Sequence, residues 1–330
     1  MPDASEQVID LENVPADREL AFKRLLDAPR ELVWKVWTDS AHVMQWWGPT
    51  GFRNTMQAME VRPGGMWRFV MHGADGTDYP NLIRYLEVKK PERLVYEHSN
   101  DGGTNDHRFH MIVTFVPEGN KTRLTMRMIH ATAAECAAVG QYAIEGGKQT
   151  LQRLSDYLLI DSPEAFIITR ELDAPRELVW KVWSDPAHLA NWFGPKGSTI
   201  LLSEMDLRPG GTYRFGLRGA GGDMYARWTF RDVVPGERLT TINEFTDAQA
   251  NPIPAPFAES WPVKMISAVY LEAIGPARTR VTVRWAPFEA TAAEETVFAN
   301  NKPSMNQGWS GTFEKLEAYL RMRADQFPAV

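Results

Sequence analysis

The chain has 330 residues, which suits two globular domains of about 150 residues each. A net charge of -6, with no run of Lys or Arg, argues against a nucleic-acid partner. No segment approaches the roughly 18 unbroken apolar residues of a membrane-spanning helix, so we expect a soluble protein with no membrane span.

The N-terminal segment is acidic, whereas a secretory signal would begin with basic residues and an apolar run. Its acidic residues are Asp3, Glu6, Asp10, Glu12, Asp17 and Glu19. The single cysteine, Cys136, excludes an internal disulfide and a multi-thiol metal site. We therefore expect a cytoplasmic protein.

An internal repeat dominates the sequence. The string LDAPRELVWKVW at residues 26–37 recurs unchanged at residues 172–183. The same shift of 146 residues carries WWGP onto WFGP and the first RPGG onto the second. The repeat predicts two domains, residues 1–161 and residues 162–330, of which the first includes a short acidic leader.

Each copy is predicted to open with a strand, at residues 166–172 in copy two. A helix then begins at Pro29 or Pro175, where proline suits the first turn. A second short helix brings Trp46 and Trp47 to its end.

The RPGG motif places proline and glycine at the two central positions of a type II turn, which predicts a hairpin. In the strand that follows, Trp67, Phe69 and Met71 share one face, and Tyr213 and Phe215 do so in copy two. We expect these faces to point inward.

The rest of copy one is predicted to form an antiparallel sheet and a closing helix at about residues 142–159. The further strands are expected at residues 82–88, 94–98, 109–115 and 124–130. A curved sheet around one long helix leaves a hollow between them. Copy two has an additional Pro-rich stretch at residues 245–262, which suggests an ordered loop or lid.

These motifs resemble a known family. APRELVWKVWTD, WWGP, RPGG before an aromatic strand, PERL, and a last helix ending in DYL or AYL are similar to the Bet v 1/START-like (SRPBCC) superfamily. The likeness is to its bacterial branch named after the C-terminal domain of the activator of heat-shock protein 90 ATPase. The resemblance implies an α+β fold of two tandem helix-grip domains, each with a cavity for hydrophobic ligands.

Large apolar side chains are the candidate cavity wall, because small-molecule sites use such walls with a few polar groups. In copy one the candidates are Trp46, Trp47, Trp67, Phe69, Met71, Tyr85, Met126, Met128 and Gly147. In copy two they are Trp192, Phe193, Tyr213, Phe215 and Trp309. Core packing is the alternative for each taken singly. Because Gly147 aligns with Trp309, we expect copy one to have the roomier cavity.

The histidines suggest a second hypothesis, in which His98 and His130 with Tyr96 act as acid–base groups in copy one. For each histidine, a plain polar wall or surface residue is the alternative. Copy two carries Asn243 and Pro287 at the matching positions and could not repeat that chemistry.

No metal site or cofactor is expected. His107 and His110 lie three residues apart in a predicted strand, where they cannot converge on one ion.

The sequence thus predicts a binding protein for an apolar small molecule, held mainly in copy one. The alternative is an enzyme of cyclase or hydrolase type. A chaperone ATPase activator is expected less, because the two copies fill the sequence. A partner-binding adaptor, which would need an exposed apolar patch, is also expected less, and a homo-oligomer remains open.

Overall fold

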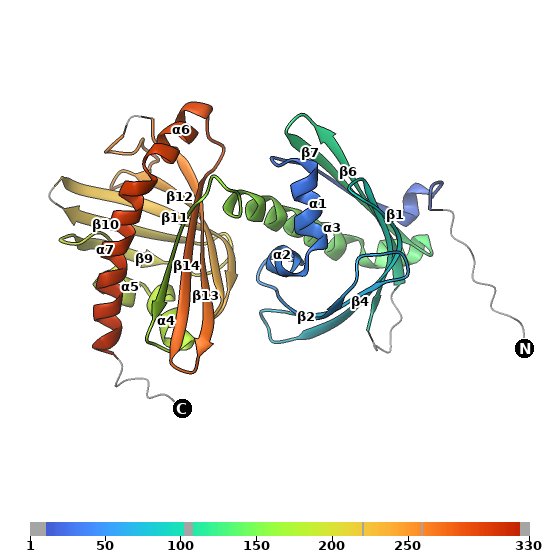
Figure 1. Cartoon of the computed structure of the whole chain (residues 1–330), viewed down its shortest axis with the longest axis horizontal. Helices are drawn as coiled ribbons and strands as arrows, with labels where there is room; N and C mark the ends of the chain where they lie inside the picture. The colour runs from blue at the N-terminus through green and yellow to red at the C-terminus, as the bar shows by residue number, and fades with distance from the viewer. Residues whose placement is uncertain (1–10, 102–107, 220, 259, 324–330) are drawn as a thin grey trace, which may run out of the picture. The chain divides into compact units, whose positions relative to one another are not determined.

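The computed structural model describes residues 11–101, 108–219, 221–258 and 260–323. The chain divides into two compact units, residues 1–158 and residues 159–330, which we call domain 1 and domain 2 (Figure 1).

Domain 1 is a seven-stranded antiparallel sheet with three α-helices. A short 3-10 helix, Ala16–Arg18, precedes the sheet. The strands are β1 (Glu19–Leu26), β2 (Arg53–Met59), β3 (Met66–His72), β4 (Asp78–Lys89), β5 (Arg93–Asn100), β6 (Arg108–Glu118) and β7 (Lys121–His130). The helices are α1 (Arg30–Thr38), α2 (Ser40–Trp46) and α3 (Ala133–Ile160). The strand order is β1-β7-β6-β5-β4-β3-β2.

Domain 2 repeats this arrangement with the strand order β8-β14-β13-β12-β11-β10-β9. Its strands are β8 (Phe166–Leu172), β9 (Thr199–Met205), β10 (Thr212–Gly219), β11 (Gly222–Val234), β12 (Arg238–Thr246), β13 (Lys264–Gly275) and β14 (Arg278–Pro287). Its helices are α4 (Arg176–Ser184), α5 (Pro186–Trp192), α6 (Ala292–Asn300) and α7 (Lys302–Arg321). The predicted α+β architecture is confirmed in both copies.

The RPGG turn is the hairpin that the sequence predicts. Gly64 has a φ of 75°, which fits the third position of a type II turn, and the Gly65 N–H donates to the Arg62 carbonyl oxygen at 2.9 Å. A Cβ at Gly65 would lie 2.3 Å from the Glu60 carbonyl oxygen, so no larger residue fits there.

The closing helix of domain 1 begins earlier than predicted, at Ala133 rather than near Tyr142. Thr132 and Glu135 form a capping box, in which the Glu135 N–H donates to Thr132 Oγ1 and the Thr132 N–H donates to Glu135 Oε2. The prediction relied on large apolar residues, which start only at Ile144, whereas small residues form the first turns.

The matching helix of domain 2 is interrupted. It forms α6 and then α7, with Pro303 in the first turn of α7. Proline lacks the N–H that a continuing helix needs and clashes with the preceding turn, so a helix breaks there.

No helix in the described ranges is long and apolar enough to cross a membrane.

Replacing Thr132 with Ala removes the capping hydroxyl of α3, and we expect a loss of about 1 kcal/mol in the free energy of unfolding of domain 1. Urea unfolding followed by circular dichroism measures it. Thr132→Ser keeps the hydroxyl and is the control. Equal losses in both variants would contradict a capping role.

Candidate functional site

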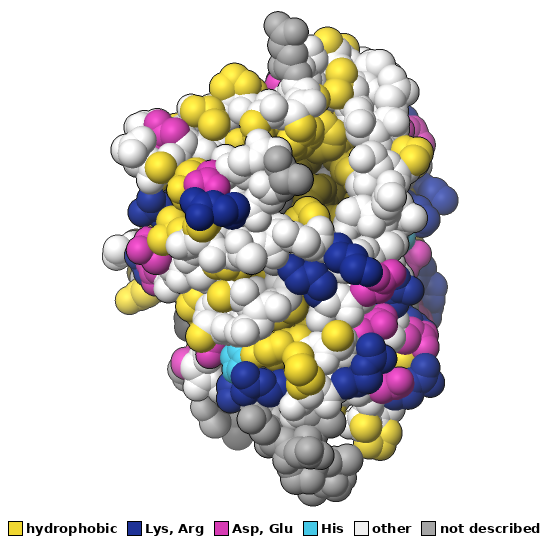
Figure 2. All heavy atoms as spheres, turned by 90° about the vertical axis from the view of Figure 1, so that its left-hand side faces the viewer, with side chains coloured by type: hydrophobic (Ala, Val, Ile, Leu, Met, Phe, Trp, Pro, Cys, Tyr) yellow, Lys and Arg dark blue, Asp and Glu magenta, His cyan; other side chains and the backbone are white. Residues whose placement is uncertain are grey.

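Domain 2 contains a cavity of about 360 Å³. This volume lies within the range of about 300–1,000 Å³ that small-molecule pockets occupy. The cavity lies between the inner face of the sheet, α7, the WFGP segment (residues 192–195) and the Pro-rich loop. Figure 2 shows hydrophobic side chains gathered around a hollow in the upper part of the surface that it displays.

The cavity wall is mostly apolar, and four parts of domain 2 supply it. The strands contribute Phe215, Leu217, Met224, Ala226, Trp228, Asn243, Glu244, Phe245, Met265 and Trp285. The WFGP segment contributes Phe193, Gly194 and Pro195, and the Pro-rich loop with the residue after it contributes Phe257, Trp261, Pro262 and Val263. The region of α7 contributes Asn301, Ser304, Met305, Gly308, Trp309 and Thr312.

Aromatic rings pack edge to face along the sheet side of this wall. The Phe193 ring centroid lies 5.2 Å from that of Phe215 and 5.0 Å from that of Trp228, with interplanar angles near 90°. Such pairs are favoured because the positive edge of one ring meets the negative face of the other. The packing fixes the orientation of flat apolar surfaces toward the cavity.

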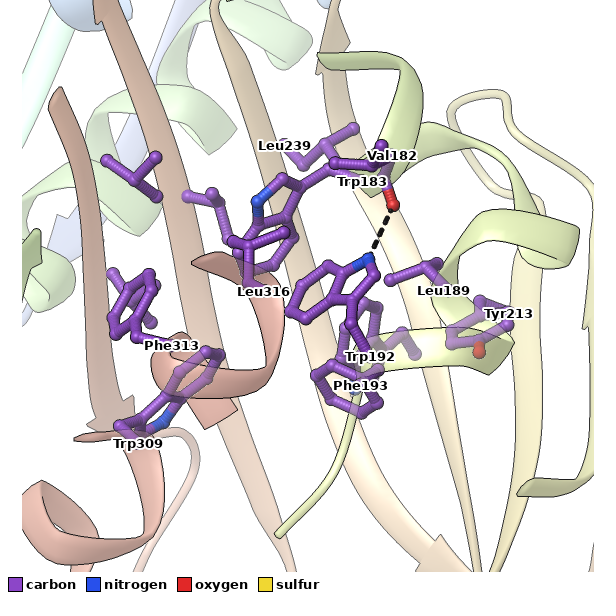
Figure 3. Packing of buried hydrophobic residues seen from close by; sticks show 14 of the residues in the cluster. Val182, Trp183, Leu189, Trp192, Phe193, Tyr213, Leu239, Trp309, Phe313 and Leu316 are labelled. Carbon is purple, nitrogen blue, oxygen red and sulfur yellow. Dashed lines mark hydrogen bonds between the residues drawn. The ribbon is translucent and has the colours of Figure 1, made fainter. Parts of the chain in front are cut away.

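Two hydrogen bonds position the WFGP segment. The Trp192 indole N–H donates to the Val182 carbonyl oxygen at 3.0 Å and joins the end of α5 to α4 (Figure 3). Lys315 Nζ on α7 donates to the Gly194 carbonyl oxygen at 3.2 Å. In domain 1, Trp46 and Arg153 make the equivalent contacts, with Val36 and with the carbonyl oxygens of the WWGP segment.

The Pro-rich stretch is an ordered loop in its described residues. Phe257 contacts Phe245 and Trp261, with ring centroids 5.4 Å apart in each pair, and Trp261 contacts Phe298 of α6. The Phe257 side chain is nevertheless 61% exposed. An exposed aromatic ring at the rim of an apolar cavity is available to cover a bound molecule.

The first half of α7 and the residue before it form one side of the cavity. A Cβ added at Gly308 would meet no heavy atom within 4 Å, so there is open space beside this position. Asn301 and Ser304, at the break between α6 and α7, also line the cavity.

The residues predicted for the copy-two wall fall into two groups. Phe193, Phe215 and Trp309 line the cavity. Trp192 and Tyr213 are buried in the core behind it, and burial raises the pKa of the Tyr213 hydroxyl to about 12.

The sequence analysis missed Trp228, Met305 and Gly308. Trp228 could have been found from strand parity, because it is paired with Tyr213 across β10 and β11.

We predicted a roomier cavity in copy one because Gly147 has no side chain. The structure contradicts this reasoning at Gly147. A Cβ at Gly147 would lie 2.5 Å from the ring of Phe22, so that ring already occupies the space beside the glycine. In domain 2 the two matching positions carry Ile168 and Trp309. The large ring lies on the strand in domain 1 and on the helix in domain 2. Gly147 therefore makes room for Phe22 and does not indicate a cavity.

Domain 1 has an open surface groove of about 1000 Å³ beside α1. Much of its lining is charged or polar, and none of the predicted wall residues belongs to it. Its lining includes Arg30, Glu31, Lys35, Asp39 and Lys90.

The predicted aromatic residues of domain 1 pack against one another. Trp67 stacks on Phe69 with ring centroids 4.2 Å apart, and Trp47 contacts Trp67 at 5.0 Å. Tyr85 and Tyr96 are neighbours at 5.9 Å. Trp46 and Met126 are also buried, whereas Met71 and Met128 are partly buried against the same core. Their role as a ligand wall stays a prediction.

The structure does not bring the proposed acid–base groups into direct contact. His98 pairs with Phe109, and Phe109 pairs with His130, so the two histidines are two strands apart. That separation is about 10 Å at the usual spacing of strands. The same register places Asn243 and Pro287 on either side of Met265, as the alignment of the copies predicts.

His98 is partly buried and its Nε2 lies 2.8 Å from Asn81 Oδ1. Burial lowers the pKa of His98 to about 4, so the ring is neutral near pH 7. The Tyr96 hydroxyl is buried with no hydrogen-bond partner among the described residues, and burial raises its pKa well above the usual value. An acid–base role for these groups stays a hypothesis.

His107 lies outside the described residues. His110 is partly buried, and burial lowers its pKa. In the part of the chain that the structure describes, no group of three His, Cys, Asp or Glu side chains could hold a metal ion.

The sequence model of one protein family matches both copies. The family is described as "Activator of Hsp90 ATPase homolog 1-like protein", and the matches cover residues 27–159 and residues 173–321. The chain belongs to this family. Membership confirms the predicted pair of tandem helix-grip domains within the Hsp90-activator-like family. No curated protein matches the sequence.

Several solved structures are similar to the chain. A Nitrosomonas europaea protein is 24% identical, and the match covers 44% of this chain and 96% of that one, with a TM-score of 0.40. A Rhodobacter sphaeroides protein is 23% identical, covering 46% and 98%, with a TM-score of 0.41. The di-domain ARO/CYC BexL from the BE-7585A biosynthetic pathway is 15% identical, covering 92% and 98%, with a TM-score of 0.47. At these identities the likeness concerns the fold alone.

Gly147→Ala is expected to destabilise domain 1 by roughly 1–3 kcal/mol, because the new methyl group must displace the buried ring of Phe22. Gly146→Ala is the matched control on the next residue of α3. Its Cβ would meet only Pro49 at 3.5 Å, and alanine favours the helix. Urea unfolding of both variants measures the difference, and similar stabilities would contradict the close packing of Phe22.

The stability of domain 1 should fall as the pH drops from about 6.5 toward 4. Over that window the unfolded chain binds a proton at His98 that the folded domain does not, so the lowered pKa of His98 removes on the order of 3 kcal/mol.

His98→Asn, which introduces the residue of domain 2, should make this pH dependence shallower. Urea unfolding across the window compares the two proteins, and identical slopes would show that His98 is not held neutral.

Proposed function

We propose that this protein binds an apolar small molecule of planar shape in the cavity of domain 2. The observation that carries the proposal is an open volume of about 360 Å³ walled mainly by aromatic and aliphatic side chains. The sequence analysis also predicted an apolar ligand, but placed it mainly in copy one and did not restrict it to planar molecules.

The aromatic side chains of the cavity wall favour a flat ligand. Phe193, Phe215 and Trp228 hold one another edge to face and line one side, while Trp309 lines the helix side. Aromatic surfaces of fixed orientation contact a planar molecule without losing side-chain freedom, because the protein has already ordered them on folding.

Binding is favoured over catalysis by the chemistry of the same wall. Its described residues include no His, Cys or Lys. Its carboxylate, Glu244, is paired with Arg227 at 2.7 Å. The alternative of a cyclase- or hydrolase-type enzyme depends on His98, His130 and Tyr96 of domain 1, which the geometry supports less well.

The proposal is tested with N-phenyl-1-naphthylamine, an uncharged fluorophore that brightens in apolar surroundings. We expect saturable binding with one molecule per chain and a rise in melting temperature. A probe at 100 times its dissociation constant should add about 2.7 kcal/mol to the stability of domain 2. The absence of both a fluorescence gain and a thermal shift at saturating probe would contradict the proposal.

Gly308→Leu should weaken probe binding about tenfold or more, because Gly308 lines the cavity on its exposed side and a leucine there would cover part of the opening. Gly308→Ala is the control: its single methyl group leaves most of the cavity free and favours the helix. Fluorescence titration compares the two variants. Equal affinities would place the probe elsewhere.

A further inference from the structure

Three polar side chains form a closed hydrogen-bonded ring on the inner face of the sheet of domain 2. Thr241 Oγ1 lies 2.7 Å from Asn243 Oδ1 and 2.8 Å from Ser267 Oγ. Asn243 Nδ2 lies 3.0 Å from Ser267 Oγ. All three side chains are buried, and Asn243 lines the cavity.

The donors and acceptors used within this ring determine which hydrogen-bonding groups of Asn243 remain available to a ligand. The Thr241 hydroxyl donates to the Asn243 carbonyl oxygen, the Asn243 amide donates to Ser267, and the Ser267 hydroxyl therefore donates to Thr241. Each hydroxyl then donates once and accepts once. Turning the Asn243 amide over reverses the direction of the ring but leaves the count unchanged. In either case Asn243 keeps one N–H and one oxygen lone pair outside the ring.

The fold does not require this hydrogen-bonded ring. The strand register of domain 1 places Tyr96, His98 and Met111 at the positions of Thr241, Asn243 and Ser267. Burying polar groups costs free energy unless they are hydrogen-bonded, and apolar residues would fill the same face at less cost. The ring fixes the plane of the Asn243 amide at the cavity wall, among the apolar neighbours Trp228 and Met265.

We propose that Asn243 binds a carbonyl or hydroxyl group of the ligand, so that domain 2 selects an apolar ring system carrying one uncharged polar group. This inference rests on the proposed function of the cavity. An uncharged group fits because the one acidic side chain of the described wall, Glu244, is already paired with Arg227. The ring makes Asn243 the specificity-determining residue, and Thr241 and Ser267 position it.

The test compares 2-naphthol with 2-methylnaphthalene, which have nearly the same shape and differ in one hydroxyl group. Dissociation constants are measured by intrinsic tryptophan fluorescence on the full chain. Asn243→Leu should weaken 2-naphthol binding about tenfold, the worth of one hydrogen bond to a buried amide. Its affinity for 2-methylnaphthalene should stay within about twofold of the wild-type value.

Asn243→Leu leaves two buried hydroxyl groups with one partner fewer, which could destabilise domain 2. A triple variant, Thr241→Val with Asn243→Leu and Ser267→Ala, removes the whole ring and replaces it with apolar groups of similar size. Removing both partners of a hydrogen bond in this way can leave stability nearly unchanged. The triple variant should also lose the preference for 2-naphthol, while its melting temperature confirms folding.

The outcomes are distinct. Loss of the naphthol preference in both variants, with methylnaphthalene binding kept, supports the inference. Unchanged preference in the folded triple variant overturns it but leaves the proposed function standing. Equal weakening of both probes also overturns it, because Asn243 would then act on the shape of the wall alone. Failure of both probes to bind the wild-type chain overturns the inference and the proposed function together.

Discussion

The core of domain 2 depends on the indole ring of Trp309. This ring on α7 contacts Trp183 of α4, Phe193 of the WFGP segment and Trp285 of β14, with ring centroids 5.5 to 6.4 Å apart. The closing helix, the first helix and the sheet thus meet at one side chain. Figure 3 labels Trp309 together with Trp183 and Phe193. Because packed rings resist compression, these contacts hold the cavity wall in place around the volume beside Gly308.

The two copies differ at a few side chains that line or adjoin the candidate site. In domain 1 the ring of Phe22 lies against the bare Gly147, whereas domain 2 carries Ile168 and Trp309 at these positions. The polar ring around Asn243 belongs to domain 2 alone. For these two reasons we favour domain 2 as the copy that binds the ligand.

The sequence predicts the fold well because its signals are local or repeated. The duplicated string, the RPGG turn and strand parity each depend on neighbouring residues. The cavity is harder to predict because its volume depends on side chains that are far apart in the sequence. Gly147 alone suggests empty space, but in the fold the ring of Phe22 fills that space. The ring of Thr241, Asn243 and Ser267 needs the register of β12 against β13, which no single segment contains.

The most direct test of the account is a ¹H–¹⁵N spectrum of the tryptophan indole groups during titration with N-phenyl-1-naphthylamine. A ligand in the cavity of domain 2 should shift the signals of Trp228, Trp261 and Trp309, which line it, and leave those of Trp47 and Trp67 of domain 1 unchanged. Saturable shifts confined to Trp47 and Trp67 would contradict the account, since the apolar ligand would then bind in the other copy.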